Sequence, residues 1–186
     1  MDDLKIIESC LLGNTQMFSR LIDNYKNMVY NLAYRMCNNP QEAEDISQES
    51  FLHTYQSLAR FNPSYKFSTW LYQITLNIIR DRFKKKELNY VSLDTPIETD
   101  DSEYYHQPVD LSNNPEQIIF QKENLRIIQQ AIYSLPLKFR EVIVLRHLQD
   151  LSYIEIANIL KLPQGTVKVR LYRAREQLKK ILTDSE

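Results

Sequence analysis

A basic segment lies near the end of the chain: GTVKVRLYRAREQLKK, at residues 165–180, has six Lys or Arg residues and one acid, although the protein of 186 residues has a net charge of -1. Cations at this density can bind DNA phosphates and the edges of guanine bases. If the segment is helical, one side carries an apolar stripe of Val167, Leu171, Ala174, Leu178 and Ile181. The opposite side and its flanks carry the candidate DNA contacts, which are Thr166, Lys168, Val169, Arg170, Tyr172 and Arg173.

A shorter helix precedes this segment and gives it the layout of a helix-turn-helix. Ser152 and Glu155 have the S-x-x-E spacing of a capping box. Residues 161–164 form the turn, with Pro163 favouring the next helix start, although Lys161 stands where many such motifs have glycine. A lone basic helix is usually only solvated. A capped helix, a short turn and a second helix in register favour binding in the major groove.

A second surface is acidic. Residues 42–49 contain four acids and no base, and a helix here presents Asp45, Gln48, Glu49 and Leu52 on one exposed side. DNA phosphates would repel this side, whereas a basic protein surface would attract it, with Leu52 as an apolar anchor. From the spacing alone, a solvated helix face is the simpler interpretation.

A third surface combines aromatic rings, amides and cations, which are the groups that bind single-stranded DNA. A helix from Ser68 to about Lys86 aligns Trp70, Gln73, Asn77, Arg80 and Lys84, and the loop before it contributes Asn62, Ser64, Tyr65, Lys66 and Phe67. Two alternatives stay open. Trp70 could simply pack in the core, and the basic residues 80–86 could be a solvated helix end that complements the helix dipole.

The elements that carry these surfaces are all helical. Period-3.6 patterns cover residues 16–37, 41–59 and 68–86 and return near Pro115, while residues 87–110 hold seven acids and no Lys or Arg. We therefore predict an all-α fold: a domain at residues 1–86, an extended acidic linker at 87–115, and a domain at 116–186 that contains the helix-turn-helix. The acidic and basic blocks are expected to have different partners.

Catalysis, metal binding and membrane insertion find no support in the sequence. His53, His106 and His147 lie far apart, and Cys10 and Cys37 have no metal-ligand spacing, so we expect no catalytic residue, metal or cofactor. No apolar run is long enough to cross a bilayer, and the N-terminus is acidic rather than like a signal peptide. We therefore expect a cytoplasmic protein without membrane insertion.

Four segments together resemble a known family. They are EAEDISQESFLHTY, KFSTWLYQITLNIIRDRFKKK, LPLKFREVIVLRHLQDLSYIEIANIL and GTVKVRLYRAREQLKK. In type and order they are similar to motifs of bacterial RNA polymerase sigma factors of the extracytoplasmic-function group (group 4 of the sigma-70 family). The resemblance covers residues 16–182 except the linker. It implies a transcription initiation factor that binds core RNA polymerase and directs it to specific promoters.

The resemblance also implies roles for the three surfaces. The acidic stripe matches the surface that docks on the β′ clamp. Loop 62–67 and the helix face with Trp70, Asn77 and Arg80 match the parts that melt the minus-ten element of promoter DNA and capture a flipped base. The helix-turn-helix matches the domain that reads the minus-thirty-five element as duplex and sits on the β flap. Lys168, Val169, Tyr172 and Arg173 match base-contacting positions, and Thr166 and Arg170 lie near phosphate contacts.

Family members are commonly inhibited by an anti-sigma factor, often membrane-anchored, so the resemblance implies such a partner here. A membrane-anchored partner would hold the protein at the inner face of the membrane. The acidic linker would lie in positively charged channels of the polymerase. Three other classes are the rival interpretations: a dimeric helix-turn-helix regulator that binds palindromic DNA, a nucleic-acid enzyme, and an adaptor that binds only proteins.

Overall fold

The structure is a computed structural model that describes residues 2–90 and 115–184, and every regular element in these two ranges is a helix. The first range contains α1 (Asp3–Leu11), η1 (Thr15–Met17), α2 (Phe18–Cys37), α3 (Pro40–Gln56), η2 (Leu58–Arg60) and α4 (Phe67–Tyr90). The second contains α5 (Pro115–Ser134), α6 (Leu137–Ile143), the π-helical turn η3 (Val144–Leu148), α7 (Tyr153–Leu160) and α8 (Gln164–Thr183). The prediction of an all-α fold is confirmed.

Both ends of α4 differ from those predicted, as do the start of α2 and the two ends of α3. Helix α4 begins at Phe67, one residue before the predicted start, and continues to Tyr90. Most of the predicted acidic linker, residues 91–114, lies outside the described residues. No helix in the part of the chain that the structure describes is both long and apolar enough to cross a bilayer.

The break between α2 and α3 shows how the sequence sets an element boundary. Asn38 ends α2 in the left-handed conformation, with φ 53°. The Asn39 side chain accepts a hydrogen bond of 2.9 Å from the backbone N–H of Glu42, which caps α3, and Pro40 occupies the first helical turn, where its missing N–H costs nothing. The chain therefore reverses tightly and packs α3 against α2.

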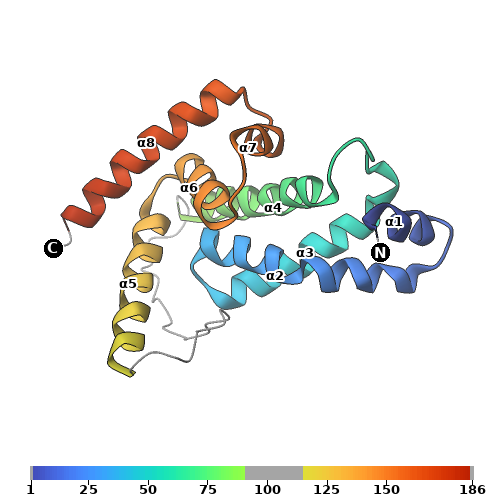
Figure 1. The fold of residues 1–186 in the computed structure, drawn as a ribbon, viewed down its shortest axis with the longest axis horizontal. Helices are drawn as coiled ribbons and strands as arrows, with labels where there is room; N and C mark the ends of the chain where they lie inside the picture. Colours follow the sequence, from blue (N-terminus) through green and yellow to red (C-terminus); the bar gives the residue numbers. More distant parts are fainter. Residues whose placement is uncertain (1, 91–114, 185–186) are drawn as a thin grey trace.

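A single apolar core joins the two halves of the chain. Its fully buried side chains include Leu32, Met36, Leu76 and Ile79 from α2 and α4, and Leu135, Val142, Leu145 and Leu171 from the C-terminal half. Helix α4 lies between α2 and α3 on one side and α6 and α7 on the other (Figure 1). A second, smaller core lies under α1 and holds Ile6, Leu21 and Leu71. The sequence had not predicted that the two halves pack together.

Arg140 of α6 fixes the centre of this packing. Its Nη1 donates to the Met36 carbonyl at 2.6 Å, and its Nη2 donates to the carbonyls of Tyr133 and Leu135. The guanidinium also lies over the rings of Phe83 and Tyr133, at 5.1 and 4.4 Å from their centroids. These carbonyls are at the C-terminal ends of α2 and α5, where the helix dipole is negative. One cation thus ties α2, α4, α5 and α6 together, and only its Nε–H has no partner among the described residues.

The helix-turn-helix has the predicted cap. The Ser152 and Glu155 side chains each bond the other's backbone N–H, which completes the capping box at the start of α7. Lys161 takes the left-handed conformation at the end of α7, with φ 54° and ψ 47°, and the N–H of Leu162 bonds the Ala157 carbonyl at 3.0 Å. Lysine therefore adopts the turn geometry that glycine usually supplies, at a cost in backbone strain.

Replacing Lys161 by glycine should stabilise the protein. Glycine adopts this φ without the Cβ clash, so Lys161→Gly is expected to raise the free energy of unfolding by about 0.5–1 kcal/mol. Urea denaturation followed by circular dichroism would measure the change. Lys161→Ala is the control, since it removes the same side chain but keeps the strain, and equal stabilities of the two variants would contradict the prediction.

Candidate nucleic-acid interface

The loop between η2 and α4 has a defined shape because its own side chains hold it. The Asn62 side chain accepts from the backbone N–H of Ser64 at 2.9 Å, and the N–H of Tyr65 bonds the Asn62 carbonyl at 3.1 Å. Pro63 occupies the position of this β-turn that its fixed φ favours. The turn leaves Ser64, Tyr65 and Lys66 exposed at the tip.

Aromatic rings support this loop from beneath. The ring centroids of Phe61, Phe67 and Trp70 lie within 5.2–5.9 Å of one another, and Tyr25 of α2 contacts Phe67 at 5.2 Å. Phe67 is 3% exposed, so its ring faces the core, whereas Trp70 is half-buried and Tyr65 is 55% exposed. Of the predicted aromatic residues, Tyr65 and Trp70 can therefore meet a base, and Phe67 is placed to hold them.

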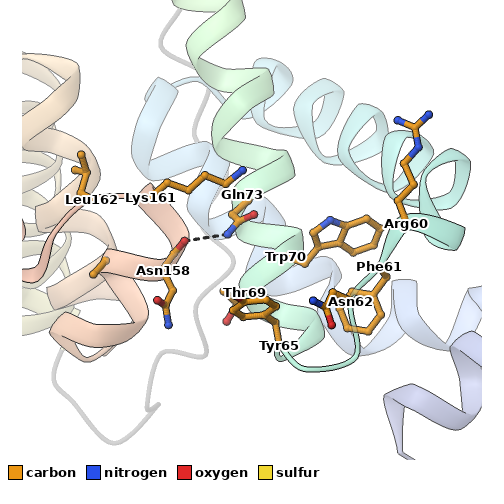
Figure 2. Close-up of a pocket in the computed structure, with 11 residues that line it drawn as sticks. Arg60, Phe61, Asn62, Tyr65, Thr69, Trp70, Gln73, Asn158, Lys161 and Leu162 are labelled. Atoms are coloured by element: carbon orange, nitrogen blue, oxygen red, sulfur yellow. Dashed lines mark hydrogen bonds between the residues drawn. The ribbon is translucent and has the colours of Figure 1, made fainter.

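A cleft of about 500 Å³ opens beside Trp70. Figure 2 shows its two walls: Asn62, Tyr65, Thr69, Trp70 and Gln73 come from the loop and α4, and Asn158, Lys161 and Leu162 come from the end of α7 and the turn after it. Stacking surface, amides and a cation are thus close together, as a nucleobase with its phosphate would require. The second wall, however, belongs to the other half of the chain.

The C-terminal half makes polar contacts with the predicted DNA-binding face of α4 and its loop. Lys66 Nζ lies 2.9 Å from a Glu155 carboxylate oxygen, and Gln73 donates to the backbone carbonyl of Asn158 at 2.9 Å. Arg80 Nε lies 2.5 Å from the Glu141 carboxylate, while Arg80 Nη1 donates to Asn77. Asn77 and Lys84 remain exposed.

Helix α8 exposes Lys168, Val169, Tyr172 and Arg173 of the predicted set to solvent, and Thr166 and Arg170 are partly buried. Val167, Leu171 and Ala174 are buried against α6 and α7, as the apolar stripe predicted. Val169 is 51% and Tyr172 67% exposed, so neither is packed in the core. Thr166, Val169, Arg170 and Arg173 border a groove of about 540 Å³, with Lys138 of α6 on its other side. Lys168 lies on the side of α8 that meets α7, with its Nζ 6.0 Å from the Tyr153 ring centroid.

The acidic stripe on α3 is exposed but partly neutralised. Leu52 is 55% exposed, and Asp45 and Gln48 face solvent. Glu49 forms an ion pair of 2.6 Å with Arg82 of α4, and Glu42 on the same helix pairs with Lys86 at 2.7 Å. The acidic block 42–49 and the basic block 80–86, which the sequence assigned to different partners, therefore partly bind each other.

Titration behaviour follows from these contacts. Hydrogen bonds, first from Lys66 and then from Ser152, lower the pKa of Glu155 to about 2. Its carboxylate is therefore ionised at neutral pH, and the stabilisation it gives would be lost only as pH falls from about 4.5 toward 2.

Burial raises the pKa of the Cys37 thiol to about 12 and that of Cys10 above its usual value, and both cysteines are buried and reduced. Within residues 2–90 and 115–184, no cluster of three His, Cys, Asp or Glu side chains could hold a metal ion.

Sequence reasoning missed the residues on the C-terminal side of the interface. Glu141, Gln149 and Asn158 contact α4 side chains, and Gln149 accepts a hydrogen bond of 2.8 Å from the buried Tyr72. Glu155 was identified only as a capping residue. The sequence contains one indication of this interface. It is the pair Arg140–Glu141, two charged residues within the apolar run of α6.

Comparisons with known proteins agree on one family. The models Sigma-70 region 2 and Sigma-70, region 4 match residues 21–88 and 125–178. The chain is 43% identical to the ECF RNA polymerase sigma factor SigW of Bacillus subtilis (strain 168), over 97% of this chain and 96% of that protein. It is 31% identical to the RNA polymerase sigma-H factor of Pseudomonas aeruginosa, over 97% and 93% of the two chains.

A solved structure shares the fold. The sigma factor RpoE from Bartonella quintana, in a co-crystal with the anti-sigma factor NepR, superposes with a TM-score of 0.70 at 22% identity, over 89% of this chain and 96% of that one.

The pKa of Glu155 should report the contact between the two halves. Lys66→Ala removes the largest cause of the low pKa, so the pKa of Glu155 is expected to rise from about 2 toward the ordinary 4.5, short of it because Ser152 still donates. Titration of the labelled carboxyl carbon by NMR would measure it, with Lys85→Ala, another exposed lysine, as the control. An unchanged pKa in Lys66→Ala would show that Lys66 and Glu155 are apart in solution.

Proposed function

The chain belongs to the extracytoplasmic-function group of RNA polymerase sigma factors, and we propose that it selects promoters by two separate readings of DNA: α8 reads the minus-thirty-five element, and α4 with its preceding loop melts the minus-ten element. Sigma factors are initiation factors and not enzymes, so RNA synthesis belongs to the polymerase. The observation that carries the proposal is the exposed face of α8 on a capped helix-turn-helix.

Reading of duplex DNA by α8 follows from the shape and charge of that face. A single helix fits the major groove, and Arg173 beside the exposed Val169 and Tyr172 can combine a guanidinium–guanine pair with apolar contacts to base edges. Arg170 and Thr166 border the groove next to Lys138, where a phosphate strand would pass. We assign base contacts to Lys168, Val169, Tyr172 and Arg173 and phosphate contacts to Thr166 and Arg170.

Melting of the minus-ten element is assigned to the cleft and the loop beside it. Trp70 and Tyr65 offer stacking surfaces, the amides of Asn62, Gln73 and Asn77 can read a base edge, and Lys66, Arg80 and Lys84 can hold the backbone. Ser64 belongs to the same exposed loop tip. The buried Phe67 acts by holding Trp70 and the loop in place.

Docking on core polymerase is assigned to the α3 stripe. Asp45, Gln48 and Leu52 combine a charge, an amide and an exposed apolar side chain, a composition that suits a basic helical surface such as the β′ clamp, and Glu49 borders them. The C-terminal half would sit on the β flap. On the polymerase, two weak DNA sites act together because their spacing is fixed.

Control by an anti-sigma factor is also proposed, in the cytoplasm or at the inner face of the membrane. The support is the shared fold with a sigma factor that was crystallised with its anti-sigma factor. Residues 87–115 would link the two promoter-reading halves, with residues 1–86 and 116–186 as the domains.

Binding to core polymerase should depend on Asp45 and Leu52. The variant Asp45→Arg with Leu52→Ala is expected to weaken binding to bacterial core RNA polymerase about tenfold or more, because it reverses a charge and removes the apolar anchor. This pair is preferable to a change at Glu49, which would also disturb the ion pair with Arg82. Pull-down with purified core measures the effect, and Asp23→Arg on α2 is the matched charge reversal. Equal binding by both variants would contradict the assignment of the stripe.

Promoter selection should depend on one arginine of α8 and not on its neighbour. Arg173→Ala is expected to cost about 1–3 kcal/mol of discrimination at a single base pair of the minus-thirty-five element. Arg175→Ala is the control, because Arg175 lies on another side of the same helix and contacts His147. Each variant would be bound to core polymerase, and the base preference of each holoenzyme would be measured by selection of promoter sequences. The same base preference for wild type and Arg173→Ala would exclude Arg173 from direct readout.

A further inference from the structure

Helix α1 lies outside the part of the chain that matches Sigma-70 region 2, which is residues 21–88. It lies at the end of the molecule remote from α5 (Figure 1). Its Ile6 and Ile7 are buried in the smaller of the two cores, and the rings of Phe61 and Trp70 pack against the same core. The site proposed to bind the minus-ten element therefore rests on a core to which α1 contributes.

One hydrogen bond joins α1 to the aromatic cluster of Phe61, Phe67 and Trp70. The Tyr25 hydroxyl on α2 donates to a carboxylate oxygen of Asp3, in the first turn of α1, at 2.5 Å. The ring of the same Tyr25 contacts the Phe67 ring, with 5.2 Å between their centroids. Burial, together with the bond to Asp3, raises the pKa of Tyr25, so its hydroxyl keeps its proton at neutral pH. Tyr25 therefore connects α1 to the aromatic cluster.

Phe67 connects Tyr25 to both ends of the loop before α4. Phe61 immediately precedes the loop residues 62–66, and Phe67 immediately follows them as the first residue of α4. The Phe61 and Phe67 centroids lie 5.7 Å apart, so this contact holds the ends of the loop together. Phe67 also contacts Trp70 at 5.9 Å and is 3% exposed, so its ring can turn only if its neighbours move.

The bond to Asp3 restricts the tilt of the Tyr25 ring. A hydroxyl that donates to a carboxylate makes a short and directional hydrogen bond, stronger than one between neutral groups. Contacts between aromatic rings, by comparison, allow a range of tilts. Asp3 therefore fixes the far end of the Tyr25 side chain, and the contact with Phe67 passes this restriction on to the loop.

We infer that Asp3 and Tyr25 are positioning residues for the minus-ten site: through their hydrogen bond, α1 holds Phe67, and with it the loop and Trp70, in the arrangement that captures a melted strand. This inference rests on the proposed role of α4 and its preceding loop in melting the minus-ten element. A loop that is already ordered loses less conformational freedom when DNA binds, so the bond favours capture without touching DNA.

Two readouts test the inference on the full chain. Trp70 is the single tryptophan of the sequence, so the intrinsic fluorescence comes from this ring alone, and its quenching by acrylamide measures how freely the ring is reached. Promoter opening is measured with each variant bound to bacterial core RNA polymerase. The DNA is a promoter fragment selected by binding to the wild-type holoenzyme, and permanganate detects its unpaired thymines.

Four variants isolate the hydrogen bond. Tyr25→Phe keeps the ring and removes the hydroxyl, Asp3→Ala removes the acceptor, and a third variant combines both changes. Asp3→Asn removes the charge but keeps an oxygen that can accept from Tyr25. The control is Tyr30→Phe, the same change on α2 at a ring that stacks on Tyr34 and not on Phe67.

The two single variants that remove the bond should behave alike. Tyr25→Phe and Asp3→Ala are each expected to increase the quenching of Trp70 and to lower promoter opening about threefold or more, which corresponds to one net hydrogen bond. The double variant should match them, because both changes remove the same bond. Asp3→Asn should restore most of the opening. Tyr30→Phe should leave both readouts unchanged.

A purely structural role for the bond would give a different result. It would lower the folded fraction, measured by urea denaturation, but would not change the quenching of Trp70 in folded chains. Unchanged quenching in Tyr25→Phe, or increased quenching with normal promoter opening, would overturn the inference. So would an equal effect of Tyr30→Phe, or additive effects in the double variant, since the two residues would then not act through one bond.

Failure of the proposed function would look different. If the wild-type holoenzyme bound the promoter fragment and opened no DNA, the assignment of melting to the loop and α4 would fall. The quenching of Trp70 would still decide whether the bond between Asp3 and Tyr25 holds the aromatic cluster in place.

Discussion

The Arg140 guanidinium is the contact on which the arrangement of this molecule depends. It donates to carbonyls at the ends of α2 and α5 and lies over rings of α4 and α5, and none of the ion pairs among the described residues involves it. Burial lowers its pKa, yet an arginine stays charged at neutral pH, so the charge is balanced by backbone dipoles and ring faces. Such a site forms only when both halves are in place. Its neighbour Glu141 then lies within reach of Arg80, which joins the face of α4 that we propose binds DNA to the C-terminal half.

The two surfaces proposed to bind DNA differ in what this arrangement does to them. Helix α8 lies on the outside of the molecule (Figure 1), and its Val169 and Tyr172 side chains are exposed. The face of α4 lies at the junction between the halves, where Arg80 pairs with Glu141. One wall of the cleft beside it comes from the end of α7 and the turn after it (Figure 2). The face of α8 that we propose reads duplex DNA is therefore exposed in the isolated chain, whereas Lys66, Gln73 and Arg80 of the proposed minus-ten site contact the C-terminal half.

The helices and their exposed faces could be predicted from the sequence because local periodicity determines both. The stripe of α8, the buried and exposed sides of α3, the capping box of α7 and the break at residues 38–40 all follow from spacing within one or two turns. The contacts between the halves could not be predicted this way. Arg80 and Glu141 are separated by 61 positions, and no period relates them. Phe67 is aromatic, which is the residue type expected of a DNA contact. The position of its ring beneath the loop, however, depends on contacts with Phe61, Trp70 and Tyr25. The left-handed Lys161 shows that a turn can form with an unfavourable residue when the helices around it pack well.

The most direct test of the account is the distance between α2 and α8, measured by spin labels on Asn27→Cys and Gln177→Cys, first in the free chain and then bound to bacterial core RNA polymerase. We expect one short, narrow distribution in the free chain and a longer one on the polymerase, where we propose that α4 and α8 reach separate promoter elements. The same short distance on the polymerase would contradict this expectation, because Lys66 and Arg80 would then remain paired with Glu155 and Glu141 in the complex that we propose melts DNA.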